Sequence, residues 1–389
     1  MNTTQKGIIT LLKSAVTGEK LPLPADFTLE SAAELIKKHS LVTLCYQGAS
    51  LCGIPADSEL MRGFFAGYYQ SLVKSERQMA AVKKIFRAFE ENDIDYLPLK
   101  GVKMKPRYPK PELRVMGDAD VLIRMEQYEK IVPIMEALGF QAGEETDHEL
   151  PWRSGSLYLE LHKRLIPSYN EDYYAYFGDG WRLARKGEGC CYDMTAEDEW
   201  IYLFTHFAKH YRDGGIGCRH VTDLWVYWRG HPGMDMAYVR GELEKLQLLE
   251  FHENILRLLA AWFEDAPLDE KSDFITEYIF VSGNFGLLEN RALSQNLKAV
   301  KKTRSARREW LHQLREALFP GHNIIDRQYP VLEKHPYLLP LFWVVRIFDK
   351  LLFQRNVVER RRRTLKVFTQ ENLDSHHAAL NYVGLDFHF

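Results

Sequence analysis

The sequence predicts an α+β fold, with a small β-sheet near the middle of the chain and helices before and after it. Apolar segments of strand character lie close together at residues 94–99, 118–123 and 157–162. Outside them, apolar residues recur at intervals of three and four, as they do in amphipathic helices. We therefore expect three parts: a helical N-terminal region at 1–92, a core at 93–192 and a helical C-terminal region at 193–389.

The N-terminal region has the pattern of three helices. The first ends near Gly18, Thr28 caps the second, and the third and longest begins near Asp57. Its aromatic and apolar stripe continues to Phe89, which is typical of a helix that packs on a core. We expect this region to form a helical layer on the central sheet and to contribute no chemistry.

Composition and charge exclude several classes of protein. With 46% hydrophobic residues among 389, the chain can bury a large core and is not disordered. A net charge of −2 argues against a dedicated nucleic-acid binder. Two segments, 300–308 and 360–363, are strongly basic, and they are either solvated helix faces or patches that steer an anionic acceptor. The five cysteines lack zinc or disulfide spacing, so we expect reduced thiols in a cytoplasmic protein. The start of the sequence lacks a signal-peptide pattern, and no apolar run reaches the roughly 18 residues that span a bilayer.

The two acids Asp118 and Asp120 precede the apolar residues 121–123. Residues two apart on a strand share a face, so both carboxylates would point the same way. Two such carboxylates repel each other, and a divalent cation between them relieves the repulsion; Mg²⁺ is the usual hard cation for this arrangement. An isolated Asp-x-Asp is more often a pair of solvated acids, so its surroundings decide.

The residues before this Asp-x-Asp favour the binding of phosphate groups. The segment 94–99 reads as a strand that ends in Lys100-Gly101, a glycine turn that leads into a short helix. Backbone N–H groups at a helix start attract anions, and Lys100, Lys103 and Arg114 add positive charge. An anion cradle beside a metal-binding carboxylate pair is what the chemistry of a nucleoside triphosphate requires.

A resemblance to a known family supports the same interpretation. The residues Leu99-Lys100-Gly101, Tyr108-Pro109 and Arg114-x-Met116-Gly117-Asp118-x-Asp120 resemble the uncharacterised nucleotidyltransferase family of the polymerase β superfamily. The resemblance implies a small mixed β-sheet nucleotidyltransferase core in which Asp118 and Asp120 hold Mg²⁺. It also implies that Lys100, Gly101, Lys103 and Arg114 bind the nucleotide. Many superfamily members have Gly-Ser in the turn, where this chain has Lys100-Gly101.

The segment 157–162 alternates apolar and polar side chains, so Glu160 and His162 share a face. The superfamily places its third carboxylate on such a strand, and Glu160 matches it by position. The resembling family more often has Asp there, and the alternative is an edge-strand acid that faces water. We expect Glu160 to complete the metal site, and His162 to contact a phosphate or the leaving group.

Two further helices are predicted after Thr195, and they carry His206, His210 and Asp223. His206 and His210 are four residues apart and lie on one face. In the resembling family, helices of this kind occupy this place, which implies that His162, His206, His210 and Asp223 form a wall of the active-site cleft. A buried His–Asp hydrogen-bond network is an equally good interpretation, and a zinc phosphohydrolase that also uses His220 is a third.

The sequence thus predicts an Mg²⁺-dependent enzyme that transfers a nucleoside monophosphate from a nucleoside triphosphate to an acceptor hydroxyl and releases pyrophosphate. The residues do not identify the acceptor, which is a small molecule, a protein or RNA. The alternative is a non-catalytic nucleotide-binding or protein-interaction module on the same fold. It is suggested by Glu160, which stands where the resembling family more often has Asp.

Overall fold

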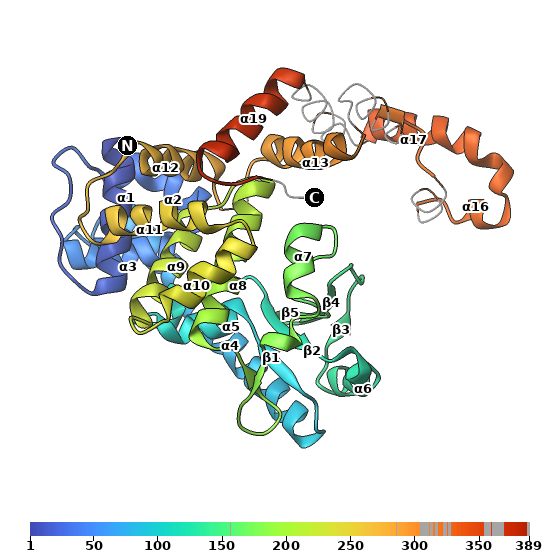
Figure 1. Cartoon of the computed structure of the whole chain (residues 1–389), viewed down its shortest axis with the longest axis horizontal. Coiled ribbons are helices and arrows are strands. Elements are labelled where there is room, and N and C mark those ends of the chain that lie inside the picture. The colour runs from blue at the N-terminus through green and yellow to red at the C-terminus, as the bar shows by residue number, and fades with distance from the viewer. Residues whose placement is uncertain are drawn as a thin grey trace. The chain divides into compact units, whose positions relative to one another are not determined.

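The computed structural model forms two compact units (Figure 1). One comprises residues 1–211, 216–285 and 383–389, and the other comprises residues 212–215 and 286–382. The residues whose structure is described are 1–155, 157–284, 286–303, 311, 314–315, 318–321, 325, 328–353, 359 and 369–386. Most of the basic run 300–308 and all of the run 360–363 lie outside the described residues.

The N-terminal region is helical, as expected. Its helices are α1 (Thr3–Thr17), α2 (Leu29–Lys38), α3 (Val42–Cys52) and α4 (Glu59–Glu91). Gly18 ends α1 with φ 77°, and the Thr28 hydroxyl accepts a hydrogen bond from the Ser31 N–H at 3.2 Å, which confirms both predicted boundaries. Helix α4 begins just after the expected position. Helix α3 was not predicted.

The central sheet has the strand order β1-β2-β5-β4-β3. Its strands are β1 (Tyr96–Pro98), β2 (Ala119–Ile123), β3 (Gln141–Ala142), β4 (Glu149–Ser154) and β5 (Leu157–His162). Strands β2 and β5 are parallel and the other pairs are antiparallel, which confirms a small mixed sheet in an α+β fold. Helix α6 (Tyr128–Ala137) lies on the connection from β2 towards β5, as a connection between parallel strands usually requires.

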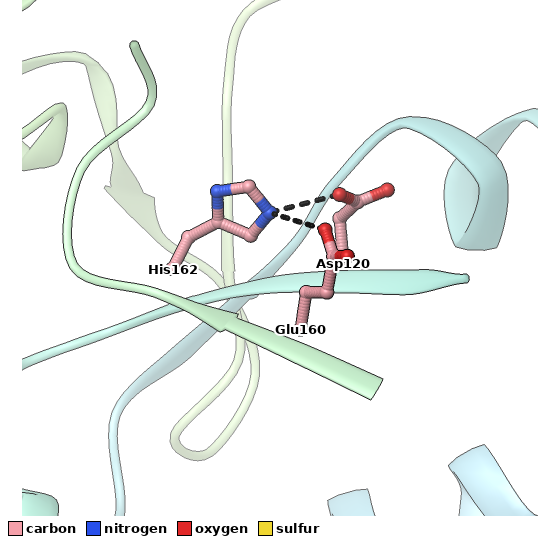
Figure 2. A group of neighbouring side chains, drawn as sticks. All are labelled: Asp120, Glu160 and His162. Atoms are coloured by element: carbon pink, nitrogen blue, oxygen red, sulfur yellow. Dashed lines mark hydrogen bonds and ion pairs between the residues drawn. The ribbon is translucent and has the colours of Figure 1, made fainter. Parts of the chain in front are cut away.

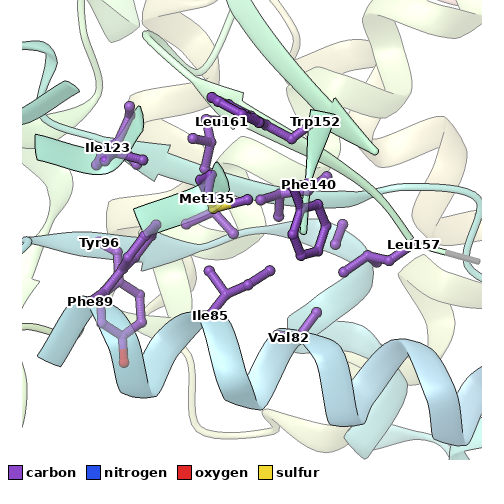
Figure 3. Close-up of a cluster of buried hydrophobic side chains, with 14 of the residues drawn as sticks. Val82, Ile85, Phe89, Tyr96, Ile123, Met135, Phe140, Trp152, Leu157 and Leu161 are labelled. Carbon is purple, nitrogen blue, oxygen red and sulfur yellow. The ribbon is translucent and has the colours of Figure 1, made fainter. Parts of the chain in front are cut away.

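One face of the sheet forms the core of this region (Figure 3). Alternate residues of β2 and β5 point into it and pack with Val82, Ile85 and Phe89 of α4 and with Met135 of α6. The residues of β2 and β5 on this face are Ala119, Val121, Ile123, Leu157, Leu159 and Leu161. Because side chains alternate along a strand, the intervening residues of both strands point to the opposite face.

Helices follow the sheet in the sequence. They are α7 (Glu171–Phe177), α8 (Ala196–Asp213), α9 (Cys218–Gly230), α10 (Met236–Lys245), α11 (Leu249–Phe263) and α12 (Glu270–Ser282), with the short strands β6 (Arg185–Lys186) and β7 (Tyr192–Asp193) before α8. The Thr195 hydroxyl accepts from the Asp198 N–H at 3.1 Å, as the predicted cap requires.

The second unit is helical over its described residues. It contains α13 (Leu288–Thr303), α16 (Val331–Lys334), α17 (Leu339–Phe353) and α19 (Gln370–Tyr382), and α13 packs against α19. Across the described residues of the whole chain, no helix combines the length and the apolar character needed to cross a bilayer.

Candidate functional site

The register of two parallel strands builds the site. Asp120 of β2 lies opposite Glu160 of β5, and Leu122 lies opposite His162. The side chains of Asp120, Glu160 and His162 therefore meet on the face of the sheet that points away from α4 (Figure 2). Each of the three contributes a ligand-type atom, and these atoms all lie within 4.8 Å of one another. We call these three residues the acid–imidazole group.

The group is tightly connected. His162 Nε2 lies 2.8 Å from Asp120 Oδ1 and 3.7 Å from Glu160 Oε2. Lys100, from the turn after β1, donates to the same Asp120 oxygen at 2.9 Å. His162 is fully buried and Asp120 is 3% exposed, so these charges interact with little screening by water.

Burial and neighbouring charges shift the pKa values of the group. Burial raises the pKa of Glu160 to about 8, and the carboxylates of Asp120, Glu149 and Asp118 reinforce the shift. Burial on its own would raise the pKa of Asp120, but the Lys100 ammonium and the hydrogen bond from His162 hold it well below its usual range. Burial and the charge of Lys100 lower the pKa of His162. The site thus brings carboxyl groups so close together that a cation would stabilise their ionised forms.

Asp118 lies outside the acid–imidazole group. It directly precedes β2, which begins at Ala119, and its side chain is exposed. Although Asp118 reaches the solvent, the surrounding protein reduces the hydration of its carboxyl, and this and the Asp120 charge raise the pKa of Asp118, so the two acids sense each other. The structure therefore brings Asp120 together with Glu160 and His162, and places Asp118 beside them at the start of the strand.

The Lys100-Gly101 turn lies against the same site. The Leu99 N–H donates to the Asp120 carbonyl at 2.9 Å, which fixes the turn to β2. Helix α5 (Lys100–Met104) follows at once and has only five residues. A Cβ on Gly101 would lie 2.6 Å from Arg114 Nη1 and 3.1 Å from Met116 Cγ, so a side chain at this position would displace the Arg114 guanidinium.

Two of the other expected phosphate ligands are engaged with acidic side chains. Arg114 forms a two-pronged pair with Asp223 of α9, with Nε 3.2 Å from Oδ1 and Nη2 3.1 Å from Oδ2. Lys103 donates to Glu199 Oε2 at 2.9 Å and also to Asp193. These pairs support the turn, and of the three cations only Lys100 contacts the acid–imidazole group directly.

The histidines of α8 form a separate pair. His206 Nε2 lies 3.1 Å from His210 Nε2, and burial together with the Lys100 charge lowers the pKa of His206 well below its usual value. Asp223 bonds to Arg114 and to the Tyr108 hydroxyl, so the expected His–Asp network does not form through it. Within the described parts of the chain, the acid–imidazole group is the one cluster that offers three metal-ligand atoms, and the set proposed for zinc is not assembled.

Sequence reasoning missed two supporting residues. Glu199 of α8 accepts from both Lys103 and Arg107, and the Tyr108 hydroxyl donates to Asp223 at 2.7 Å. Glu199 follows two other acids in the first turn of α8, where a stretch of acidic residues reads as a helix start. Its contacts with Lys103 and Arg107 distinguish it, since Asp198 beside it is equally buried, and those contacts arise only from the packing.

The donor set suits a divalent cation. Two carboxylates and one imidazole converge. Burial raises the pKa of Asp118 and of Glu160, and repulsion from the neighbouring acids, which a cation would relieve, adds to both shifts. The residues present therefore fit a divalent cation.

The part of the chain that builds this site matches a known protein family. The family model described as uncharacterised nucleotidyltransferase matches residues 26–264, a span that includes the sheet, the acid–imidazole group and Asp223. Among solved structures, the solution structure of the antibiotic-resistance factor ANT(2'')-Ia is similar, with a TM-score of 0.34 and 15% sequence identity over 46% of this chain and 98% of that chain. No curated protein matches. The match over residues 26–264 covers more than half of the sequence, and the chain is therefore a member of the uncharacterised nucleotidyltransferase family.

Proposed function

We propose that this protein transfers a nucleoside monophosphate from a nucleoside triphosphate to an acceptor hydroxyl, with Mg²⁺, and releases pyrophosphate. The observation that carries the proposal is the register that sets Asp120 opposite Glu160, with Lys100 bonded to Asp120. Family membership supports the reaction class.

In this proposal, Asp118 and Asp120 would hold Mg²⁺ ions, and Glu160 would complete one of the metal sites. The ions would neutralise phosphate charge and align the displacement. The acceptor oxygen bonds to the α-phosphorus while the bond from that phosphorus to the pyrophosphate oxygen breaks. Glu160 takes up the hydroxyl proton. Lys100 and the backbone at Gly101 position the triphosphate and offset its charge.

In this proposal, the Arg114–Asp223 pair supports the Lys100-Gly101 turn and does not contact the nucleotide. Arg114 Nη1 lies at the position that a side chain on Gly101 would occupy, so the pair sets where the turn backbone lies. The charge of Lys100 acts on His162 and His206, and His210 contacts His206, so we propose these histidines as the wall on that side. The acceptor is a small molecule, a protein or RNA that carries a hydroxyl group.

The test is a calorimetric titration of ATP, GTP, CTP and UTP with Mg²⁺, followed by a pyrophosphate-release assay. Asp118→Asn and Asp120→Asn should each abolish transfer while the circular dichroism spectrum stays unchanged, because each removes a negative ligand without changing side-chain size. Asp26→Asn, the same change at an exposed position, is the matched control. Retained transfer in either site variant would remove the mechanism.

One observation favours a second candidate, a non-catalytic nucleotide-binding module. Two expected phosphate ligands, Lys103 and Arg114, are occupied by acidic side chains. Metal-dependent nucleotide binding without pyrophosphate release, with every acceptor class tested, would support the module and exclude the transferase.

A further inference from the structure

The acid–imidazole group contains a nitrogen donor, which an all-carboxylate magnesium site lacks. His162 extends from β5 two residues after Glu160, so the two side chains share a face and reach the same point. Its Nε2 points between the carboxylates of Asp120 and Glu160 (Figure 2). The ring is fully buried, which fixes this position.

The nitrogen donor affects which metal ion the site prefers. Mg²⁺ prefers an octahedron of oxygen ligands and keeps several waters, whereas an imidazole nitrogen suits first-row transition ions such as Zn²⁺ and Co²⁺. Mn²⁺ accepts both carboxylate oxygens and an imidazole. A set of two carboxylates and one imidazole therefore raises affinity for transition ions more than for Mg²⁺.

The imidazole can present Nε2 as a ligand. Ligation requires the ring proton to reside on Nδ1. The Nε2 N–H donates to the Asp120 carboxylate, so metal ligation requires this proton to move to Nδ1. The Nδ1 atom is buried and has no hydrogen-bond partner among the described residues, so no donor there prevents it from taking the proton. The contact between Nε2 and Asp120 Oδ1 is then the one interaction that a metal ion would replace.

We propose that Asp120, Glu160 and His162 bind a divalent transition ion through two carboxylates and the Nε2 nitrogen of His162, in preference to Mg²⁺. The inference deepens the proposed function and rests on it for its catalytic meaning, since the second cation, Mg²⁺, arrives with the triphosphate beside Asp118. The metal selectivity of the site thus comes from a single side chain on β5.

The experiment measures metal binding directly on the untagged full chain. MgCl₂, MnCl₂, CoCl₂ and ZnCl₂ are titrated calorimetrically into the wild type, His162→Gln and His148→Gln. The glutamine at position 162 keeps a polar group near Asp120 but replaces the nitrogen donor with an amide. His148 is the matched control because its ring lies 5.8 Å from that of His162 and outside the acid–imidazole group. Pulsed electron paramagnetic resonance of the Mn²⁺-loaded protein then detects ¹⁴N coupling from a ligating imidazole.

The expected result is tighter binding of Co²⁺ and Zn²⁺ than of Mg²⁺, with ¹⁴N coupling in the wild type and in His148→Gln. His162→Gln should lose the coupling and bind Co²⁺ and Zn²⁺ at least tenfold more weakly, with a change of less than about threefold for Mg²⁺. Wild-type protein without ¹⁴N coupling, coupling that survives in His162→Gln, or an equal loss for all four ions would overturn the proposal. The wild-type spectrum tests the proposal even if His162→Gln does not fold.

Failure of this inference and failure of the proposed function give different results. If metal preference does not depend on His162 but Mg²⁺-nucleotide binding is lost in Asp118→Asn and Asp120→Asn, only the transition-ion site is wrong. If neither metal nor nucleotide binds, both proposals are wrong.

Discussion

Replacing Asp223 by asparagine tests whether the Arg114–Asp223 pair supports the fold or serves the nucleotide. The change keeps the size of the side chain but removes the charge that balances the buried Arg114 guanidinium. Arg219 lies close enough that the charge of Arg114 acts with burial to lower its pKa, so the variant leaves two guanidinium groups without their common anion. We expect a large loss of stability.

The magnitude follows from the burial of the pair. Removing one partner of a buried ion pair costs about 3–5 kcal/mol, because the other charge is left without compensation. For a unit of about 290 residues, the unfolding entropy is about 0.6 kcal/mol/K, so Tm should fall by about 5–8 °C. In a double-mutant cycle with Arg114→Met and Asp223→Leu, the combined loss should be smaller than the sum by about 2 kcal/mol or more.

Thermal unfolding followed by circular dichroism measures the change, and nucleotide titration separates the two roles. Asp95→Asn is the control, because Asp95 pairs with Arg124 at 2.7 Å where both side chains are more exposed. That pair should contribute about 1 kcal/mol or less. An Asp223→Asn protein with unchanged Tm and weakened nucleotide binding would refute the structural role of the pair.

Two further predictions concern the turn and a buried histidine. Gly101→Ala should displace the turn, because the added Cβ would lie 2.6 Å from Arg114 Nη1. We expect nucleotide affinity to fall at least tenfold, with a smaller effect on Tm. Nucleotide titration checks this, with Gly117→Ala as the control because a Cβ there meets nothing within 4 Å. His39 should titrate near pH 4 by NMR, because burial lowers its pKa to about 4 and its Nδ1 accepts from the Cys218 N–H. The unfolded chain takes up this proton near pH 6.5, so the stability from neutral His39 is complete above that pH and decreases towards pH 4. The loss is roughly 2 kcal/mol between pH 7 and pH 5, and a midpoint of titration near 6.5 would contradict the reasoning.

The sequence predicted strands β1, β2 and β5 because their signals are local, but it did not mark β3 and β4 as strands. Alternation in Leu157–His162 placed Glu160 and His162 on one face, and the helix caps at Gly18 and Thr28 marked boundaries through their own backbone groups. Helix α3 was missed because it has no side-chain cap at its start and includes a β-branched residue, Thr43, and a glycine, Gly48. Such a helix is stabilised by packing against α1 and α4, which no local pattern records.

The partners of the cations could not be predicted, for a related reason. Arg114 meets Asp223 across 109 positions, and Lys103 meets Glu199 across 96. A basic residue near a glycine turn attracts phosphate or a distant carboxylate equally well, and only the packing of α8 and α9 against the turn decides between them. The register of β2 and β5 is likewise non-local, although the period-two pattern limited it to two faces.

Lys100 is the residue at which fold and site depend on each other most directly. Its φ of 39° is a left-handed conformation that a side chain rarely adopts, with a cost of order 1 kcal/mol. The conformation persists because the turn is bonded to β2 through the Leu99 N–H and because the ammonium reaches Asp120 at 2.9 Å. An uncompensated Asp120 carboxylate, 3% exposed, would cost far more than this strain. The sequence therefore keeps a lysine where a glycine would be less strained, and the cation that stabilises the buried acid is the one expected to meet the triphosphate.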